Sequence, residues 1–384
     1  MKIVSIETWS TPALCFVNAN FDNGIRGLGQ TAPYHADISA MVMHKQIAPL
    51  AIGNELPSDA GEIADLGIKI LKDPLMAGSP GGLCEKIAVK NYKHFGSHLF
   101  RTLSGLELAM WDALGKAAGK PVYSLLGAKR NSVSVYGSSM DYNMPEEEEA
   151  ARMKGFYEAG YGAFKLHCGR PNSGDNADSR PGRTEKVVKL VREAIGNAEL
   201  YMDVNGNYTP DFAVKRIPFL EEHGVSILEE PCYYWEVEQT REVYKASRNT
   251  GVRVAGGEQD YMLPQWRRYC DPAAVDIIQP DVCYIGGLSR CLAVAQMAKA
   301  KGILTTTHTA NRSMLPLFSS HYLCSVENYF EYMEYSIEKE PWNENLIIDY
   351  PEVKNGKLML TEKPGWGVLI NPGWLKKAQY QITK

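Results

Sequence analysis

The sequence has no Cys-x-x-Cys pair, no block of Lys and Arg, and no apolar stretch long enough to span a bilayer. The eight cysteines are scattered, mostly within apolar runs, which excludes a thiolate zinc site and a redox pair. The 41 Lys and Arg against 45 Asp and Glu give a net charge of −4 without a basic stripe. We therefore expect a cytoplasmic protein with reduced thiols and with neither nucleic acid nor membrane as a partner.

The N-terminal stretch lacks the continuous apolar core and small-residue cleavage site of a secretory signal, and instead alternates like a strand. Strand patterns cover residues 2–10, 13–21 and 25–31, and the Asn23-Gly24 pair marks the turn before the third. Helical patterns follow, the clearest over 103–120. This order predicts an α+β domain over residues 1–128.

From about residue 133 the pattern changes to short apolar β-rich runs that alternate with helical stretches. Such runs are typical of a parallel sheet covered by helices on both faces, and eight of them predict a closed α/β barrel over residues 129–351. A doubly wound open sheet is the alternative, although no Gly-rich phosphate turn follows the first strand of either region. We expect the tail, residues 352–384, to leave the barrel and return to the first domain. The runs are 133–138, 162–168, 200–205, 225–231, 252–258, 275–281, 303–309 and 328–334.

Three consecutive runs, the third to the fifth, carry a carboxylate at or near the end of the strand: Asp203, Glu229 and Glu258. The carboxyl ends of barrel strands converge on one face, and the three residues lie one βα unit apart along the chain, so they should sit side by side. Three carboxylates at close quarters repel one another unless a cation is present, and hard oxygen ligands suit Mg²⁺ or Mn²⁺. Successive side chains of a strand point to opposite faces, so only one of the neighbours Glu229 and Glu230 can face the cluster. Glu229 is preferred, and Glu230 is the alternative.

Two further pairs point to acid–base chemistry. His308 ends the seventh run and Asp281 the sixth, so a carboxylate can orient one ring nitrogen while the other exchanges a proton. Lys165 and His167 are two residues apart on the second run and face the same side. Lys165 could neutralise a substrate carboxylate, and His167 could act as a second acid or base.

These residues and their order along the chain resemble those of the enolase superfamily and, within it, of the mandelate racemase-like subgroup. The resemblance covers essentially the whole chain: SGLELAMWDALGKAAGKPVYSLLG in the first domain, then KLH, DVN, EEP, GGE, QPD and THT in the family's order. One departure is Lys165-Leu166-His167, where members commonly carry Lys-x-Lys.

The resemblance implies a modified (β/α)7β TIM barrel with an α+β capping domain and one Mg²⁺ held by Asp203, Glu229 and Glu258. It also implies a Lys or His base that removes the α-proton of a carboxylate substrate, giving an enediolate that Mg²⁺ stabilises. By the same carry-over, Glu331 in the eighth run would lie beside the substrate carboxylate, with Glu334 as the alternative, and Asn205 would contact substrate.

The function expected is dehydration of an acid sugar to a 2-keto-3-deoxy acid, with His308 able to serve as base and acid. Polar residues expected around the site favour a polyol substrate: Arg312 after the seventh run, and Tyr34 and His35 in an early loop. A racemase or epimerase, with His167 as the second base, is the runner-up. A non-catalytic binding protein that retains the fold is the alternative of another class. We also expect a homo-oligomer.

Overall fold

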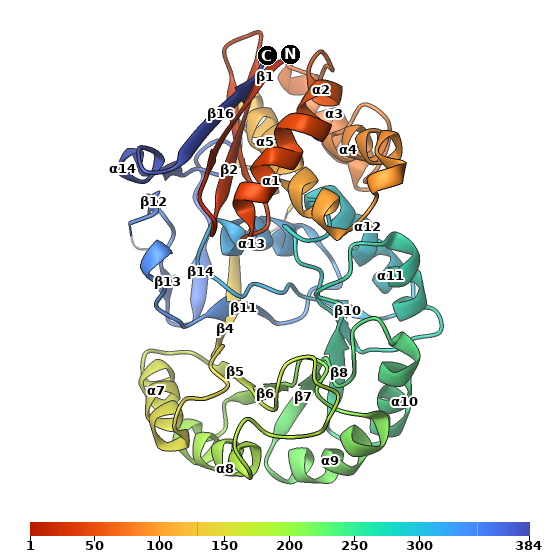
Figure 1. The fold of residues 1–384 in the computed structure, drawn as a ribbon, viewed down its shortest axis with the longest axis vertical. Coiled ribbons are helices and arrows are strands. Elements are labelled where there is room, and N and C mark those ends of the chain that lie inside the picture. Colours follow the sequence, from red (N-terminus) through yellow and green to blue (C-terminus); the bar gives the residue numbers. More distant parts are fainter. Residues whose placement is uncertain (129, 344) are drawn as a thin grey trace.

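A computed structural model of the chain describes residues 1–128, 130–343 and 345–384. It contains an α+β cap and an α/β barrel, and the two chain ends lie side by side on the cap (Figure 1). Lys129, where the barrel domain was expected to begin, lies outside the described residues. No helix within the described ranges has the length and apolar character needed to cross a membrane.

The cap is built on an antiparallel sheet in the order β16-β1-β2-β3. The third strand packs closely against the long helix α5. A Cβ at Gly27 would lie only 1.9 Å from the carbonyl oxygen of Ala109, so the strand needs glycine at this position. Helix α5 ends at Gly119, whose φ of 65° gives the left-handed turn that commonly closes helices. The cap strands are β1 (Ile3–Ser10), β2 (Cys15–Phe21), β3 (Arg26–Gln30) and β16 (Gln379–Thr383). The cap helices are α1 (Ala36–Val42), α2 (Ala48–Ala51), α3 (Ala60–Ile70), α4 (Pro80–Lys90), α5 (Ser97–Ala118) and α6 (Val122–Leu125), with a π-helical turn at Met43–Ile47 and a 3-10 turn at Tyr92–His94.

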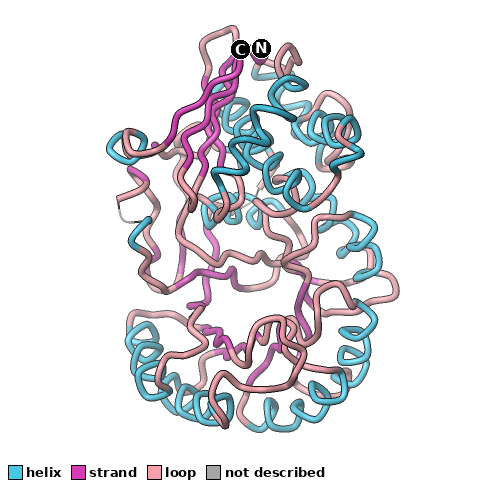
Figure 2. Tube along the Cα trace, in the orientation of Figure 1, coloured by secondary structure: helices cyan, strands magenta, loops and turns pink. Residues whose placement is uncertain are grey.

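The barrel consists, within the described residues, of eight parallel strands that alternate with helices on the outside (Figure 2). The last strand pairs with the first, Tyr332 opposite Ser134, which closes the ring. The expected (β/α)7β barrel with an α+β cap is therefore confirmed. The strands are β4 (Ser132–Ser138), β5 (Ala163–His167), β6 (Glu199–Asp203), β7 (Val225–Glu229), β8 (Arg253–Gly256), β9 (Ile277–Ile278), β10 (Leu304–Thr305) and β11 (Tyr332–Ser336). The helices are α7 (Glu146–Glu158), α8 (Arg183–Ile195), α9 (Pro210–Glu222), α10 (Val237–Ser247), α11 (Leu263–Cys270), α12 (Leu288–Lys299) and α13 (Leu315–Ser325).

After the barrel, the chain runs back along it to the cap. Strand β14 pairs antiparallel with β4, and β16 pairs antiparallel with β1, so the tail contributes to both sheets. The small elements of the tail are a 3-10 turn (Pro341–Asn343), β12 (Ile347–Ile348), β13 (Val353–Lys354), β14 (Lys357–Met359), β15 (Leu369–Ile370) and α14 (Pro372–Leu375).

Helix α5 holds the barrel, the cap sheet and the tail together through two buried carboxylates. Glu107 accepts hydrogen bonds from the backbone N–H groups of Leu288 and Ser289 at the start of α12, where the helix dipole favours a negative charge. Asp112 accepts from the backbone N–H groups of Leu28 in the cap and Trp366 in the tail. The position of the cap over the barrel is thus fixed by charge-assisted hydrogen bonds in the interior.

A buried histidine completes this interface. His321 on α13 is fully buried, and its Nδ1 accepts a hydrogen bond of 3.0 Å from the backbone N–H of Tyr123 at the cap exit. Its ring also packs edge-on against Trp366, 4.9 Å between ring centroids. Burial lowers the pKa of His321 to about 3, so the ring is neutral in the folded protein.

This neutral ring predicts a loss of stability in acid. Because the folded pKa lies below the ordinary value of 6.5, only the unfolded chain binds a proton as the pH falls from 6.5 toward 3. The free energy of unfolding should fall in this window by up to about 1.4 kcal/mol per pH unit from His321 alone. In urea titrations at several pH values, His321→Asn should show a shallower fall than the wild type, and the exposed control His94→Asn should not. Parallel curves for all three proteins would contradict this origin.

Candidate active site

Polar side chains gather at the carboxyl ends of the barrel strands, on the side that faces the cap. His167, Asp203 and Glu229 are the last residues of β5, β6 and β7, and Glu258 follows β8 by two residues. All four are buried. The register of the parallel strands sets His167 beside Asp203 and Asp203 beside Glu229, so the local folding of consecutive βα units alone brings them together.

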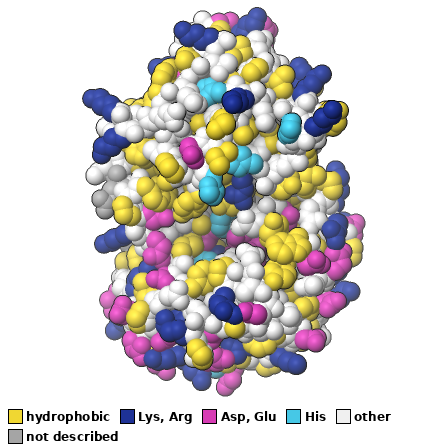
Figure 3. Space-filling view, in the orientation of Figure 1, with side chains coloured by type: hydrophobic (Ala, Val, Ile, Leu, Met, Phe, Trp, Pro, Cys, Tyr) yellow, Lys and Arg dark blue, Asp and Glu magenta, His cyan; other side chains and the backbone are white. Residues whose placement is uncertain are grey.

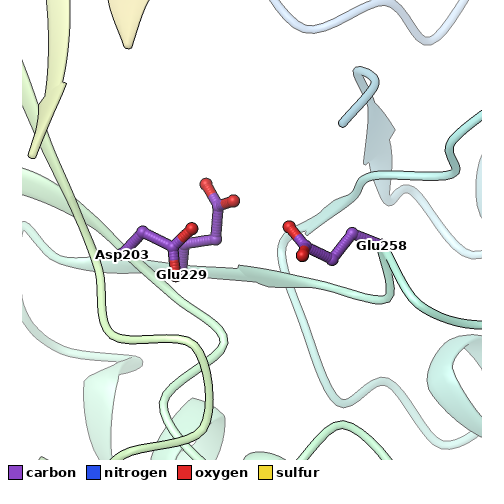
Figure 4. Close-up of side chains that lie close together, drawn as sticks. All are labelled: Asp203, Glu229 and Glu258. Atoms are coloured by element: carbon purple, nitrogen blue, oxygen red, sulfur yellow. The ribbon is translucent and has the colours of Figure 1, made fainter. Parts of the chain in front are cut away.

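The three expected metal ligands form one cluster. One oxygen each of Asp203, Glu229 and Glu258 lies within 4.8 Å of the others. In Figure 4, Asp203 and Glu229 lie side by side and Glu258 points toward them from the facing side. Burial raises the pKa of the Glu229 and Glu258 carboxyls, whereas Lys165 and His167 outweigh burial at Asp203 and hold its pKa below the usual range.

A fully buried lysine lies beneath the cluster. The Nζ of Lys165 is 2.6 Å from Glu229 Oε1, 2.7 Å from Glu334 Oε1 and 3.3 Å from Asp203 Oδ2. Burial alone would lower the pKa of Lys165, but these carboxylates raise it well above its usual range. Lys165 therefore compensates protein carboxylates, and its expected contact with a substrate carboxylate stays a prediction.

The donor set fits a hard divalent cation. All three groups offer carboxylate oxygens, and Oε2 of Glu258 is buried without any hydrogen-bond partner in the described structure. A buried carboxylate oxygen without a donor is costly unless a cation lies against it. Oxygen-only ligation suits Mg²⁺ better than zinc.

His308 and Asp281 form the expected pair. His308 Nδ1 is 2.8 Å from Asp281 Oδ2, and His308 Nε2 is 3.7 Å from Glu258 Oε1. Asp281 is itself fixed, because its Oδ1 accepts from the backbone N–H groups of Cys283 and Tyr284. Burial would lower the pKa of His308, but Glu258 and then Asp281 raise it to about 10. A cation bound to Glu258 would weaken the first of these two effects.

His167 lies on the other side of the cluster. Its Nδ1 contacts the backbone carbonyl oxygen of Ser139, and its Nε2 is 3.1 Å from Asp203 Oδ2. Both ring nitrogens of His167 therefore face oxygen atoms that can accept a hydrogen bond. His167 and His308 thus flank the carboxylate cluster through different ligands, Asp203 and Glu258.

The glutamate of the eighth strand that lies at the site is Glu334, and the prediction that Glu331 lies there is wrong. Glu331 is exposed and precedes the first residue of β11, at the end of the strand opposite to the site. Glu334 is fully buried and accepts from Ser138 Oγ and the backbone N–H of Thr309. Burial would raise the pKa of Glu334, but Lys165 outweighs it and lowers the pKa to about 2.

Two polar side chains complete this edge of the site. Asn205 donates from Nδ2 to Asp203 Oδ2 at 3.2 Å, and its Oδ1 accepts from the hydroxyl of Tyr142. The ring of Tyr142 packs edge-on against His167, 5.2 Å between centroids. Tyr142 was not predicted, because it lies in the loop after β4, where the sequence has no distinguishing pattern.

Besides Asn205, three residues were expected to bind substrate, and they lie in different places. Arg312 donates to the backbone carbonyl of Glu338 and lines a cavity with Tyr335, whose side chain points away from the interior position of Glu334. Arg312 therefore lies outside the carboxylate cluster, contrary to expectation. Tyr34 and His35 are exposed on the cap loop before α1, and both have left-handed backbone conformations, φ 64° and 50°. The hydroxyl of Tyr34 donates to Glu340 at 3.2 Å.

Comparison with known families gives matches over both domains. The family described as mandelate racemase / muconate lactonizing enzyme, N-terminal domain, matches residues 2–127. The family described as enolase C-terminal domain-like matches residues 147–374.

Individual relatives are similar over nearly their whole length. Arabinonate dehydratase of Saccharolobus solfataricus is 24% identical over 376 residues, 96% of this chain and 97% of the relative. A crystal structure from Roseobacter denitrificans, provisionally named a racemase, is 39% identical with a TM-score of 0.91 and complete coverage of both chains. A mandelate racemase/muconate lactonizing protein from Paracoccus denitrificans, solved with magnesium, shares the fold at 23% identity and a TM-score of 0.82, over 98% of this chain and 96% of its own.

The carboxylate cluster predicts a stabilising effect of Mg²⁺ that depends on Glu258. Mg²⁺ should raise the thermal midpoint of the wild type and EDTA should lower it, because a ligand that binds only the folded state stabilises it. Glu258→Gln removes one of the three charges and should weaken Mg²⁺ binding about 10- to 100-fold in calorimetry. The matched control is Glu331→Gln, an exposed Glu outside the cluster, which should bind Mg²⁺ like the wild type. Equal affinity in both variants would refute the assignment.

Proposed function

The chain belongs to the enolase superfamily and its mandelate racemase-like subgroup, and from this premise we propose that it dehydrates an acid sugar to a 2-keto-3-deoxy acid. The substrate class is supported by the name of a relative that matches almost the entire chain, an arabinonate dehydratase. The chemistry is supported most strongly by one observation, the hydrogen bond between His308 and Asp281 beside the carboxylate cluster.

His308 would remove the α-proton. Asp281 holds Nδ1 and stabilises the positive charge that the ring acquires when Nε2 takes the proton. The α-proton of a carboxylate is very weakly acidic, so the electrons left on the substrate need strong electrostatic stabilisation. Mg²⁺ held by Asp203, Glu229 and Glu258 would supply the positive charge that stabilises the enediolate.

His167 would donate a proton to the departing β-hydroxyl group. With the α-proton on His308 Nε2, loss of hydroxide together with a proton from His167 Nε2 yields water and an enol, which tautomerises to the keto acid. Nε2 is the nitrogen placed for this step, because it faces the cluster beside Asp203 Oδ2, whereas Nδ1 faces the carbonyl oxygen of Ser139. Lys165 and Glu334 stay paired throughout and keep the charge of the cluster balanced.

A racemase or epimerase is the second candidate, for two reasons. A protein 39% identical to this chain carries a provisional racemase name. In addition, His167 lies beside Asp203 and His308 beside Glu258, so the two imidazoles flank the cluster. One could remove a proton from one face of the substrate and the other return a proton to the opposite face. The two candidates share the first step and differ in what His167 does next.

The first experiment is a screen of acid sugars with Mg²⁺ that measures 2-keto acid formation, with parallel samples in D₂O. We expect keto acid from at least one sugar and a loss of about 10²- to 10⁴-fold in kcat in His308→Asn, which cannot accept the proton. The matched control is His94→Asn, an exposed histidine on the cap, which should retain full activity.

The variant His167→Asn separates the two candidates. For a dehydratase, it should slow keto acid formation while α-proton exchange by His308 continues. Deuterium exchange with inversion at the α-carbon and no keto acid would establish the racemase or epimerase instead. Neither product nor exchange across the library would contradict the substrate class.

A further inference from the structure

An arginine from the cap reaches the mouth of the barrel beside the site. Arg101 lies near the start of α5, and its Nη2 donates to Gln259 Oε1 at 3.0 Å. Gln259 in turn donates from Nε2 to Glu258 Oε1 at 2.9 Å. Only one side-chain amide therefore separates the guanidinium group from an expected metal ligand.

An aromatic ring fixes the orientation of this guanidinium group. The Cζ of Arg101 lies 3.4 Å from the centroid of the Tyr284 ring, which is itself 5.4 Å from the ring of His308. The hydroxyl of Ser104, one turn further along α5, donates to the carbonyl of Cys283 and holds the two segments together. Arg101 is thus held in place on the side of the site where His308 lies, and it remains partly exposed.

Within residues 1–128, 130–343 and 345–384, Arg101 makes no salt bridge, and the hydrogen bond of its guanidinium group goes to the uncharged Gln259. Its neighbours Gln259 and Tyr284 are uncharged. An arginine held at a domain interface usually gains its stability from a bidentate carboxylate or phosphate. The charge of Arg101 is therefore free to pair with an anion from solution.

Other positive groups lie at the start of α5 with Arg101. The first turn of α5 contains no acidic residue and its N-cap, Gly96, supplies no side-chain cap, so the positive end of the helix dipole is not compensated. Burial lowers the pKa of His98, and the positive charges of Arg101 and His35 lower it further. On the face shown in Figure 3, histidine side chains gather around a basic side chain where the cap meets the barrel.

We propose that Arg101 binds a second carboxylate at the far end of the substrate, so that the enzyme selects diacid sugars over the corresponding monoacids. This inference rests on the proposed function, since the first carboxylate must lie at the Asp203, Glu229 and Glu258 cluster. A short sugar-acid chain that runs past His308 then ends near Arg101, where the terminal carboxylate can accept two parallel N–H hydrogen bonds. His98 and His35 add donors around the same end.

Another explanation is that Arg101 acts only on the metal site, by positioning Glu258 through Gln259. In that case its removal would weaken all substrates equally. A terminal carboxylate subsite instead makes the loss specific to diacids, because a monoacid presents a neutral hydroxyl group at the same end. The two explanations therefore differ in the ratio of the diacid affinity to the monoacid affinity, and not in the affinity for either substrate alone.

The test measures binding without turnover. In the His308→Asn variant with Mg²⁺, calorimetry would compare matched pairs such as D-gluconate with D-glucarate and D-galactonate with galactarate. We expect at least one diacid to bind about 10- to 100-fold more tightly than its monoacid partner. Adding Arg101→Gln should abolish this ratio, and Arg101→Lys, which keeps the charge without the planar fork, should restore part of it. Arg267→Gln, which removes the same charge from the exposed side of α11, should leave the ratio unchanged.

The possible results separate this inference from the proposed function. Equal affinity for both members of every pair, or an equal loss for both in Arg101→Gln, would overturn the diacid subsite whatever the activity. Diacid preference without keto acid formation by the active enzyme would support the subsite and count against dehydration. A thermal melt of each variant verifies that Arg101→Gln is folded.

Discussion

The interaction on which the structure depends is the repulsion among buried carboxylates at the carboxyl ends of the barrel strands. Asp203, Glu229, Glu258 and Glu334 are buried within reach of one another, an arrangement that a barrel produces readily because its strand ends converge. Lys165 compensates part of this charge from below, in contact with three of the four. Part of the negative charge remains uncompensated, which is the physical reason that the cluster suits a divalent cation.

Closing the site over this cluster requires a cap that is fixed in position, and α5 provides it. Glu107 holds the start of α12, and Asp112 holds both the third cap strand and the tail. These bonds are buried, so they exclude water and resist sliding of one domain over the other. The same helix carries Arg101 at its exposed start. A substitution at Glu107 or Asp112 would therefore disturb the docking of the cap, whereas one in the first turns of α5 would leave these bonds intact.

The sequence predicted the residues whose positions follow from strand ends. Asp203, Glu229 and Glu258 came from a repeating βα spacing, and a parallel barrel leaves no freedom in where such residues lie. The choice of Glu331 was wrong because the eighth run contains two Glu, three residues apart, whose side chains would point to opposite faces of a strand. The sequence does not tell which one lies within the strand, whereas the observed start of β11 at Tyr332 does. Arg312 and Arg101 could not be ranked, because the direction of a loop or cap side chain depends on contacts between distant segments, such as Arg101 with Gln259.

The two histidines differ in what holds them, and this difference bears on their roles. Nδ1 of His308 is bonded to a carboxylate, which stabilises the imidazolium and so strengthens the ring as a base. Nδ1 of His167 is bonded to a neutral backbone carbonyl, and the carboxylate that contacts this ring, Asp203, instead faces Nε2. A pair of groups with unlike surroundings is suited to one accepting and one donating step, as in an elimination. A racemase that works in both directions would need the two groups to exchange roles, and therefore surroundings more alike than Asp281 and Ser139 provide.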